Sequence, residues 1–179
     1  MATQRDVNPR QLVKLREFSM QLAQRLKDAP NMPTEPTRLA LRIGVDNFLV
    51  EMGLAAEIVA LPDIARVPWT KPWYRGLANV RGRLVGVVDL QHLTGREPLS
   101  AEQGQQLLVL GEGLGLAAGV LVTRAFGIRN LKDLEPLDTG APARAPWERS
   151  RFRDLDGITL TELDLRELAA SAVLTAIHT

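Results

Sequence analysis

Cysteine is absent from this chain of 179 residues, and histidine and aromatic side chains are scarce. The absence of cysteine excludes a disulfide framework, a thiol nucleophile and a thiolate metal site. The two histidines, His92 and His178, lie far apart, and neither has a sequence neighbour at the spacing of a catalytic triad or a metal set. We therefore expect no catalytic residue, no metal site and no cofactor.

An excess of charge of one sign is also missing, because 22 Lys and Arg residues nearly balance 21 Asp and Glu residues. The net charge of +1 gives no broad attraction to nucleic acid or to an anionic membrane. No apolar run approaches the roughly 20 residues that span a bilayer, and the N-terminal sequence lacks the apolar core of a signal peptide. We expect a cytoplasmic protein with no nucleic-acid partner and no direct insertion into a membrane.

An amphipathic pattern is present over residues 9–28, where Pro9 suits the first turn of a helix. Residues 29–36 contain three prolines, which should end that helix. The sequence therefore predicts a helical extension and a Pro-rich linker over residues 1–36. Its apolar stripe is a possible second interface, either for the rest of the chain or for a partner. The stripe includes Leu12, Leu15, Leu22 and Leu26.

From Arg38 onward the pattern changes to short apolar runs separated by Gly-, Pro- or polar-rich turns. The segment 44–46 is a plausible hairpin connection between the first two runs. Many short strands with frequent turns indicate small barrels or a sandwich rather than a parallel α/β sheet. After a loop-like stretch that begins near Pro136, residues 161–177 look helical. Thr161 is the expected N-cap, with Asp164 three residues on as in a capping-box variant.

The most informative stretch is residues 66–90, RVPWTKPWYRGLANVRGRLVGVVDL. Two prolines and two tryptophans fill its first half, and a glycine-punctuated turn then precedes an apolar strand. It contains no nucleophile–base pair, so a rigid loop that presents Arg81 suits a protein that binds rather than reacts. Gly76, Asn79 and Gly82 are expected to shape turns.

Three further side chains of this stretch have expected structural roles. Trp69 and Trp73 are predicted to pack over the core, although an exposed tryptophan would mark an interface anchor. Asp89 follows a run that looks buried, and its carboxylate is expected to bind a nearby backbone amide.

An ordered series of motifs resembles the CheW-like family of bacterial chemotaxis coupling proteins. LRIGVDNFLVEM resembles the first hairpin of that family, and Ala56-Glu57-Ile58 resembles the step that follows it. Residues 66–90 resemble the family's hallmark sequence, and QQLLVLGEGLGLAAGVLVTRAFGIRNL resembles the later hairpin and its exit. Two positions depart from the family pattern: Gly86 stands where proline is usual, and Thr123 where aspartate is common.

The resemblance implies a mainly β fold over residues 37–179, with two packed five-stranded SH3-like β-barrel subdomains. An N-terminal helix and a C-terminal helix would be added to it. It also implies an adaptor without catalytic activity, which bridges a chemoreceptor cytoplasmic tip and the regulatory domain of a CheA-type histidine kinase. Such an adaptor is recruited to membrane receptor arrays. The extra N-terminal helix makes the chain more similar to the adaptor of type IV pilus, twitching-motility systems than to that of flagellar systems.

By the same resemblance, Arg81, Glu57, Ile58 and Val80 map to the receptor-facing side, at the groove between the barrels. The alternative for Arg81 is a structural role, in which its side chain stabilises its own loop. Three other functions stay open: a CheW-like scaffold of another signalling complex, a nucleic-acid-binding barrel and a small hydrolase. The nucleic-acid reading requires arginines gathered into one stripe with exposed aromatics. The hydrolase reading requires a pocket with paired carboxylates of perturbed pKa.

Overall fold

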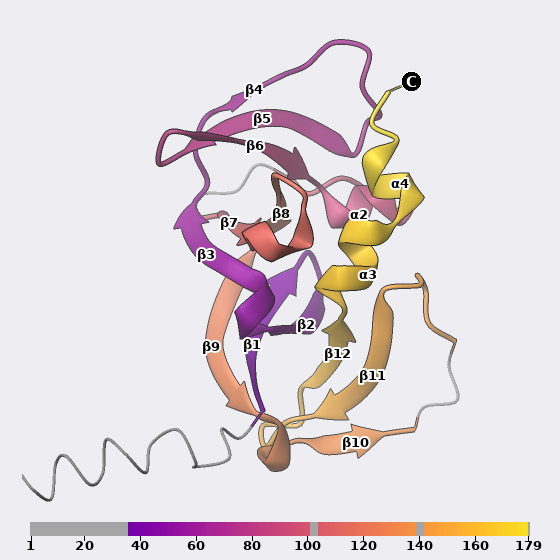
Figure 1. The fold of residues 1–179 in the computed structure, drawn as a ribbon. Helices are drawn as coiled ribbons and strands as arrows, with labels where there is room; N and C mark the ends of the chain where they lie inside the picture. Colours follow the sequence, from indigo (N-terminus) through magenta and orange to yellow (C-terminus); the bar gives the residue numbers. More distant parts are fainter. Residues whose placement is uncertain (1–35, 101–103, 139–141, 179) are drawn as a thin grey trace, which may run out of the picture. The chain divides into compact units, whose positions relative to one another are not determined.

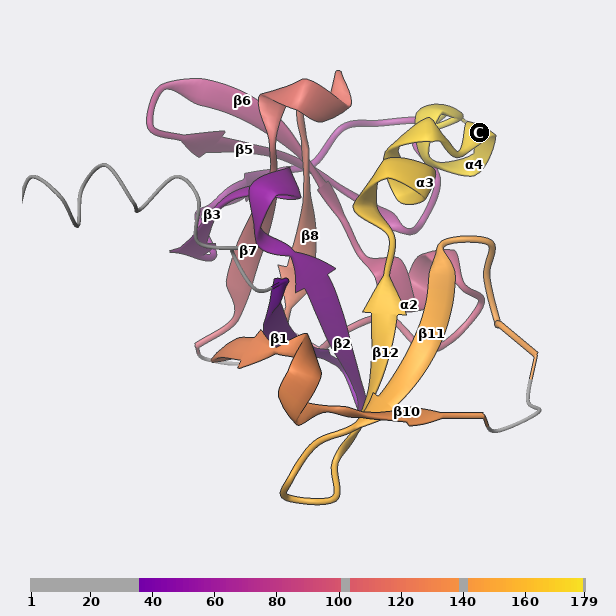
Figure 2. The same ribbon diagram turned by 60° about the horizontal axis from the view of Figure 1, so that its bottom comes forward.

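Two six-stranded sheets dominate this computed structural model, which describes residues 36–100, 104–138 and 142–178 (Figures 1 and 2). The first sheet has the order β10-β11-β12-β2-β1-β9, and the second has the order β3-β7-β8-β6-β5-β4. The strands of the first sheet are β1 (Thr37–Ile43), β2 (Asp46–Glu51), β9 (Arg124–Asn130), β10 (Glu135–Leu137), β11 (Glu148–Arg153) and β12 (Thr159–Leu163). Those of the second are β3 (Ala55–Ala60), β4 (Ile64–Ala65), β5 (Tyr74–Val80), β6 (Arg83–Val88), β7 (Gln106–Leu110) and β8 (Ala118–Val122).

The helical elements are short and connect or follow the strands. The α-helices are α2 (Leu90–Leu93), α3 (Leu165–Ala170) and α4 (Ala172–Thr175). The 3-10 turns are η2 (Met52–Leu54), η3 (Glu112–Leu114) and η4 (Leu131–Asp133). The first sheet thus takes strands from both ends of the described chain, and the second takes its strands from the middle (Figure 1).

The expectation of a mainly β protein with two packed β subdomains is confirmed. Each sheet has six strands rather than the expected five, because a short strand is added at one edge of each. These are β4, with two residues, and β10, with three residues including Pro136. Strands this short carry no readable alternation of apolar and polar residues. The expected helix over residues 9–28 and its leucine stripe lie outside the described residues.

Strands β1 and β2 bury both of their faces over their central residues, which are apolar. Leu41 and Phe48 point into the main core, while their neighbours Ala40 and Leu49 point into a smaller cluster with Leu134 and Leu160. Successive side chains of a strand alternate between the two faces of its sheet, so one hairpin supplies both clusters. Gly44, with φ of +61°, makes the connection between the two strands that the sequence predicts.

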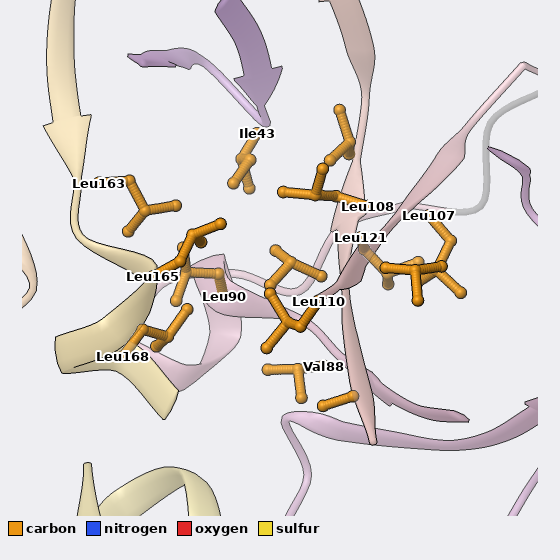
Figure 3. Close-up of a cluster of buried hydrophobic side chains, with 14 of the residues drawn as sticks. Ile43, Val88, Leu90, Leu107, Leu108, Leu110, Leu121, Leu163, Leu165 and Leu168 are labelled. Carbon is orange, nitrogen blue, oxygen red and sulfur yellow. The ribbon is translucent and has the colours of Figure 1, made fainter. Parts of the chain in front are cut away.

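The main core joins the two sheets and the C-terminal helices. It includes Leu90 from α2, which lies between β6 and β7, Leu108 from β7 of the second sheet, and Leu165 from α3. Figure 3 shows these leucines converging with others on one apolar region. All three are 3% exposed or less. The packing of the two subdomains therefore depends on α2 and α3 as well as on the sheets.

The prediction of one C-terminal helix capped by Thr161 is wrong. Thr161 lies in β12 and pairs with Arg151 of β11 and Phe48 of β2. The helix begins at Leu165, because the Asp164 carboxylate accepts hydrogen bonds from the backbone amides of Arg166 (2.9 Å) and Glu167 (3.0 Å). A carboxylate that accepts two orphan amides is a strong N-cap. The backbone leaves the helical conformation at Ser171, which caps the separate helix α4.

Asp164→Ala is expected to lower the free energy of unfolding by about 1–2 kcal/mol, the usual cost of losing an N-cap. Burial raises the pKa of Asp164, but hydrogen bonds from the Glu167 amide, the Arg149 side chain and the Arg166 amide outweigh it, and the net pKa is lowered. The ionised form is therefore favoured on folding. This stabilisation is complete above the unfolded-state pKa of about 3.9 and is lost as the pH falls through the lower folded-state value.

The measurement is urea unfolding of the wild type, Asp164→Ala and Asp164→Asn at pH 7 and pH 3. Asparagine retains the capping oxygen, so Asp164→Asn isolates the contribution of the charge. We expect the difference between wild type and Asp164→Asn to shrink at pH 3. A difference of the same size at both pH values would contradict the assigned charge.

Candidate functional site

The turn between β5 and β6 places Arg81 at the tip of a tight hairpin. Val80 pairs with Arg83, and the two residues between them, Arg81 and Gly82, have φ angles of +51° and +84°. Positive φ at both central residues is the geometry of a type I′ turn, which favours asparagine and glycine. The Gly82 amide donates a hydrogen bond to Oδ1 of Asn79 (2.8 Å), which holds the turn from below.

Arg81 and Glu57 form an ion pair that spans the second sheet. The Arg81 Nε atom lies 2.8 Å from Oε2 of Glu57, and the Arg81 side chain is 79% exposed. Glu57 lies on β3, at one edge of this sheet, whereas the Arg81 hairpin includes β5, next to the other edge. The contact therefore joins the two ends of the sheet. An ion pair this exposed contributes about 1 kcal/mol or less to stability.

The other two residues of the expected receptor side point inward. Ile58 is half-buried and packs against the main core. Val80 is 5% exposed and belongs to that core, so the expectation that Val80 offers a partner contact is corrected. The reason is strand alternation on β5: Ala78 and Val80 face inward, while Asn79 between them is exposed. All four expected residues lie on the second sheet or its hairpin, and only Arg81 and Glu57 contact each other through an ion pair.

Gly76 lies where β5 approaches β4 closely. Its φ is +131°, and a Cβ atom at this position would lie 2.2 Å from the carbonyl oxygen of Ala65. A side chain cannot be placed there without moving the backbone of β4. Gly76 thus sets the close spacing of these strands. The loop between them carries Trp69 and Trp73.

The two tryptophans of residues 66–90 have opposite environments. Trp73 is 7% exposed and packs in the core, as expected. Trp69 is 84% exposed and has a φ of +58°, so the expectation that it packs over the core is wrong. Among the described residues, Trp69 and Arg81 alone combine a positive φ with a side chain other than glycine. Residues other than glycine rarely adopt a positive φ, and those that do cluster at functional sites.

Asp89 organises the end of the hallmark stretch. Its side chain is fully buried and accepts hydrogen bonds from the backbone amides of Leu99 (2.8 Å) and His92 (3.1 Å). It also forms an ion pair of 3.2 Å with Nη1 of Arg75. The expected bond to a backbone amide is confirmed. Asp89 thereby caps α2 and attaches the chain at Leu99 to the end of β6.

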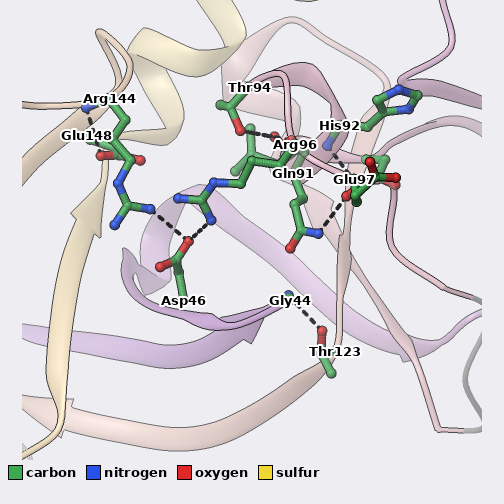
Figure 4. A network of polar contacts seen from close by, with 12 residues as sticks. Gly44, Asp46, Gln91, His92, Thr94, Arg96, Glu97, Thr123, Arg144 and Glu148 are labelled. Atoms are coloured by element: carbon green, nitrogen blue, oxygen red, sulfur yellow. Dashed lines mark hydrogen bonds and ion pairs between the residues drawn. The ribbon is translucent and has the colours of Figure 1, made fainter.

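A polar network that local sequence patterns do not reveal surrounds Asp46 (Figure 4). Arg96 and Arg144 both pair with Asp46, from positions 50 and 98 residues away in the chain. The carboxylate of Glu148 accepts a hydrogen bond from the Arg144 amide (3.1 Å). Sequence separations this long produce no motif, so no sequence signal marks this cluster.

This network includes the kind of carboxylate pair that a hydrolase would need. Burial raises the pKa of Glu148, with a smaller rise from Asp46, while Arg151 and Arg96 lower it. The cavity that Asp46 and Glu148 line has a volume of only about 10 Å³, which is room for one water molecule. Two arginines also neutralise Asp46. The cluster therefore has the chemistry of a structural junction and no space for a substrate.

Most arginines of the described chain are distributed in local ion pairs rather than in one stripe. The arginines of such pairs lie on strands of both sheets, as in Arg38–Glu162, Arg83–Glu112, Arg149–Asp164 and Arg153–Glu135. This arrangement does not supply the arginine stripe that the nucleic-acid reading requires. Within residues 36–100, 104–138 and 142–178, no three acidic or histidine side chains gather as metal ligands. The helices of these same ranges are too short or too polar to cross a membrane.

Comparison with known proteins identifies the family to which this chain is similar. The CheW-like domain model matches residues 38–173. Protein PilI of Pseudomonas aeruginosa is 34% identical over 120 residues, which cover 67% of this chain and 65% of PilI, so the match spans less than two thirds of PilI. Chemotaxis protein CheW of Thermotoga maritima is 29% identical over 112 residues, which cover 63% of this chain and 68% of that protein.

A solved structure gives the same result for the fold. The scaffolding protein TtCheW from Thermoanaerobacter tengcongensis superposes with a TM-score of 0.65, covering 78% of this chain and 96% of that one. At 16% identity, this likeness concerns the fold alone. CheW-family proteins are non-enzymatic scaffolds. Since the family model spans residues 38–173, the chain belongs to the CheW-like domain family.

Proposed function

We propose that this protein is a non-enzymatic adaptor that couples chemoreceptor cytoplasmic tips to the regulatory domain of a CheA-type histidine kinase in pilus-based motility. The family match supports the adaptor role, and the similarity to PilI supports the pilus branch. In this proposal residues 37–179 form the coupling domain, and residues 1–36 form an N-terminal extension. The adaptor acts in the cytoplasm, recruited to a membrane receptor array.

The observation that carries the receptor contact is the backbone conformation of Arg81. The left-handed conformation is costly for a long side chain and suits glycine or asparagine at this turn position. The ion pair with Glu57 contributes little to the stability of the fold because it is exposed to solvent. Neither the turn nor the ion pair therefore accounts for an arginine here. A guanidinium that Glu57 holds at the tip of a hairpin is well placed to donate paired hydrogen bonds to a partner carboxylate or carbonyl.

The test is calorimetric titration of the protein with a receptor cytoplasmic tip and, separately, with a kinase regulatory domain. Arg81→Ala is expected to weaken receptor binding at least about tenfold, which corresponds to about 1.4 kcal/mol. Alanine keeps the Cβ atom, so the strain of the turn is unchanged. The matched control is Arg153→Ala, which removes one exposed arginine from an ion pair on the first sheet.

Asn at position 81 separates binding from folding. Arg81→Asn is expected to leave the free energy of unfolding unchanged or higher, because asparagine tolerates positive φ, and still to weaken binding. If neither partner binds the wild type, the coupling function is refuted and another signalling complex must be sought. If both bind and Arg81→Ala behaves as Arg153→Ala does, the assignment of Arg81 is refuted.

A further inference from the structure

A second candidate binding surface lies at the other end of β5, where the loop after β4, the start of β5, His92 and Pro98 line an open pocket of about 440 Å³. This volume is in the range of ligand pockets in proteins. Arg66, Lys71 and Arg75 line the pocket together with His92, and none of the lining residues is acidic. Arg75 already pairs with the carboxylate of Asp89, which is buried. The pocket is therefore a confined concentration of positive charge on a chain with a net charge of only +1.

Two of these cations are available for an external anion. Within the described residues, neither Arg66 nor Lys71 forms an ion pair. Nδ1 of His92 is buried and has no hydrogen-bond partner among those residues. This contrasts with the arginines on the two sheets, most of which have an acidic neighbour. Unneutralised cations that line one concave surface are the usual recognition element for carboxylates and other oxyanions.

The loop that forms the pocket is held rigidly. The Lys71 amide donates to the carbonyl of Ile177 (2.8 Å), and Thr70 forms a β-bridge with His178. The Thr70 hydroxyl donates to the carbonyl of Val67 (2.9 Å). The C-terminal segment thus fastens the loop in place. A surface that is ordered before binding loses less conformational entropy when a ligand arrives.

Trp69 supplies an apolar anchor on the same loop. It directly precedes Thr70 and Lys71, it is 84% exposed, and its φ of +58° is unfavourable for an aromatic residue. The exposure of a tryptophan and its backbone conformation both cost free energy in the isolated protein. Tryptophan beside arginine is the composition typical of the energetic centre of a protein–protein interface.

We propose that this pocket binds the carboxylates of an acidic segment in a protein partner, with Trp69 packing against apolar side chains of that segment. A protein is favoured over nucleic acid because the basic patch is confined to one pocket, whereas nucleic acid requires a path of cations along its backbone. The surface is separate from Arg81, because the two lie at opposite ends of β5. The inference therefore does not depend on the proposed receptor contact.

The test uses a capped hexapeptide, Ac-Glu-Leu-Glu-Asp-Leu-Glu-NH₂, and its counterpart with Gln and Asn in place of the acids. Binding to the full chain is followed by ¹H–¹⁵N NMR through the indole signal of Trp69 and the amide signal of Lys71. We expect both signals to shift with the acidic peptide only. The double variant Arg66→Ala/Lys71→Ala is expected to lower the affinity at least fivefold. The charge-matched control, Arg124→Ala/Arg153→Ala on the first sheet, should stay within twofold of the wild type.

Trp69→Asn tests the anchor separately from the fold. Asparagine tolerates positive φ, so the melting temperature of the Trp69→Asn variant should equal or exceed that of the wild type. The affinity of this variant for the acidic peptide should fall at least threefold. Equal binding of the amide peptide, or an equal loss in the Arg124/Arg153 control, would show diffuse charge attraction and overturn the proposal. If a hexauridylate shifts the same two signals and binds with higher affinity than the acidic peptide, the proposal is overturned in favour of nucleic acid.

Discussion

Asp89→Ala is expected to lower the free energy of unfolding by about 3–5 kcal/mol, the range observed when one partner of a buried ion pair is removed. The Asp89 carboxylate is fully buried and binds two backbone amides and the Arg75 guanidinium. Alanine would leave two amides and a partly buried cation without their acceptor. The change would also remove the N-cap of α2, which carries Leu90 into the core between the sheets.

Urea unfolding followed by circular dichroism measures this loss. Asp89→Asn retains one acceptor oxygen of similar shape, and we expect it to lose less stability than Asp89→Ala. Asp133→Ala, which removes an exposed acid on η4, is the control and should change stability by about 0.5 kcal/mol or less. A loss below about 1 kcal/mol in Asp89→Ala would show that the buried carboxylate is not an organising contact.

Leu165→Ala is expected to lower the free energy of unfolding by about 2–5 kcal/mol, as for other large-to-small changes in a packed core. Leu165 is completely buried at the start of α3, and it packs in the core that joins both sheets (Figure 3). The cavity left by the change would lie where the helix and the two subdomains meet, so the surrounding backbone can collapse only partly.

The control for Leu165→Ala is Val173→Ala on α4, where the valine is 51% exposed. Alanine favours a helix more than valine does, so this variant should match or slightly exceed the stability of the wild type. Thermal unfolding by differential scanning calorimetry compares the two. Similar melting temperatures for Leu165→Ala and the wild type would show that α3 does not hold the subdomains together.

Local patterns in the sequence determined the parts of this structure that depend on near neighbours. The β1–β2 hairpin follows from apolar runs on either side of Gly44, and the Arg81–Gly82 turn follows from polar and glycine residues between strands. The family could be inferred for the same reason, because its motifs are an ordered series of such turns and strands. Asp89 was recognisable as a binder of backbone amides because it directly follows a buried strand.

The candidate site was predictable only in part. The sequence indicated Arg81 and Glu57, but their ion pair joins β3 to a hairpin near the far edge of the same sheet, and only sheet closure brings them together. The inward position of Val80 depends on the register of β5, because a shift of one residue would reverse the face of every side chain. The sequence indicated Thr161 as the N-cap, with Asp164 only as its capping-box partner. Pairing with β2 and β11 instead makes Thr161 part of β12, and Asp164 is the N-cap of α3.

The sequence by itself therefore determined the β1–β2 hairpin, the Arg81–Gly82 turn, the family and the lack of local catalytic motifs. Only the tertiary structure placed Trp69 on the surface, gathered Arg66, Lys71 and Arg75 around one pocket, and brought Arg96 and Arg144 to Asp46. The physical reason is distance along the chain. Turns and strand alternation are set by residues a few positions apart, whereas exposure, charge pairing and concave surfaces arise from contacts between segments tens of residues apart.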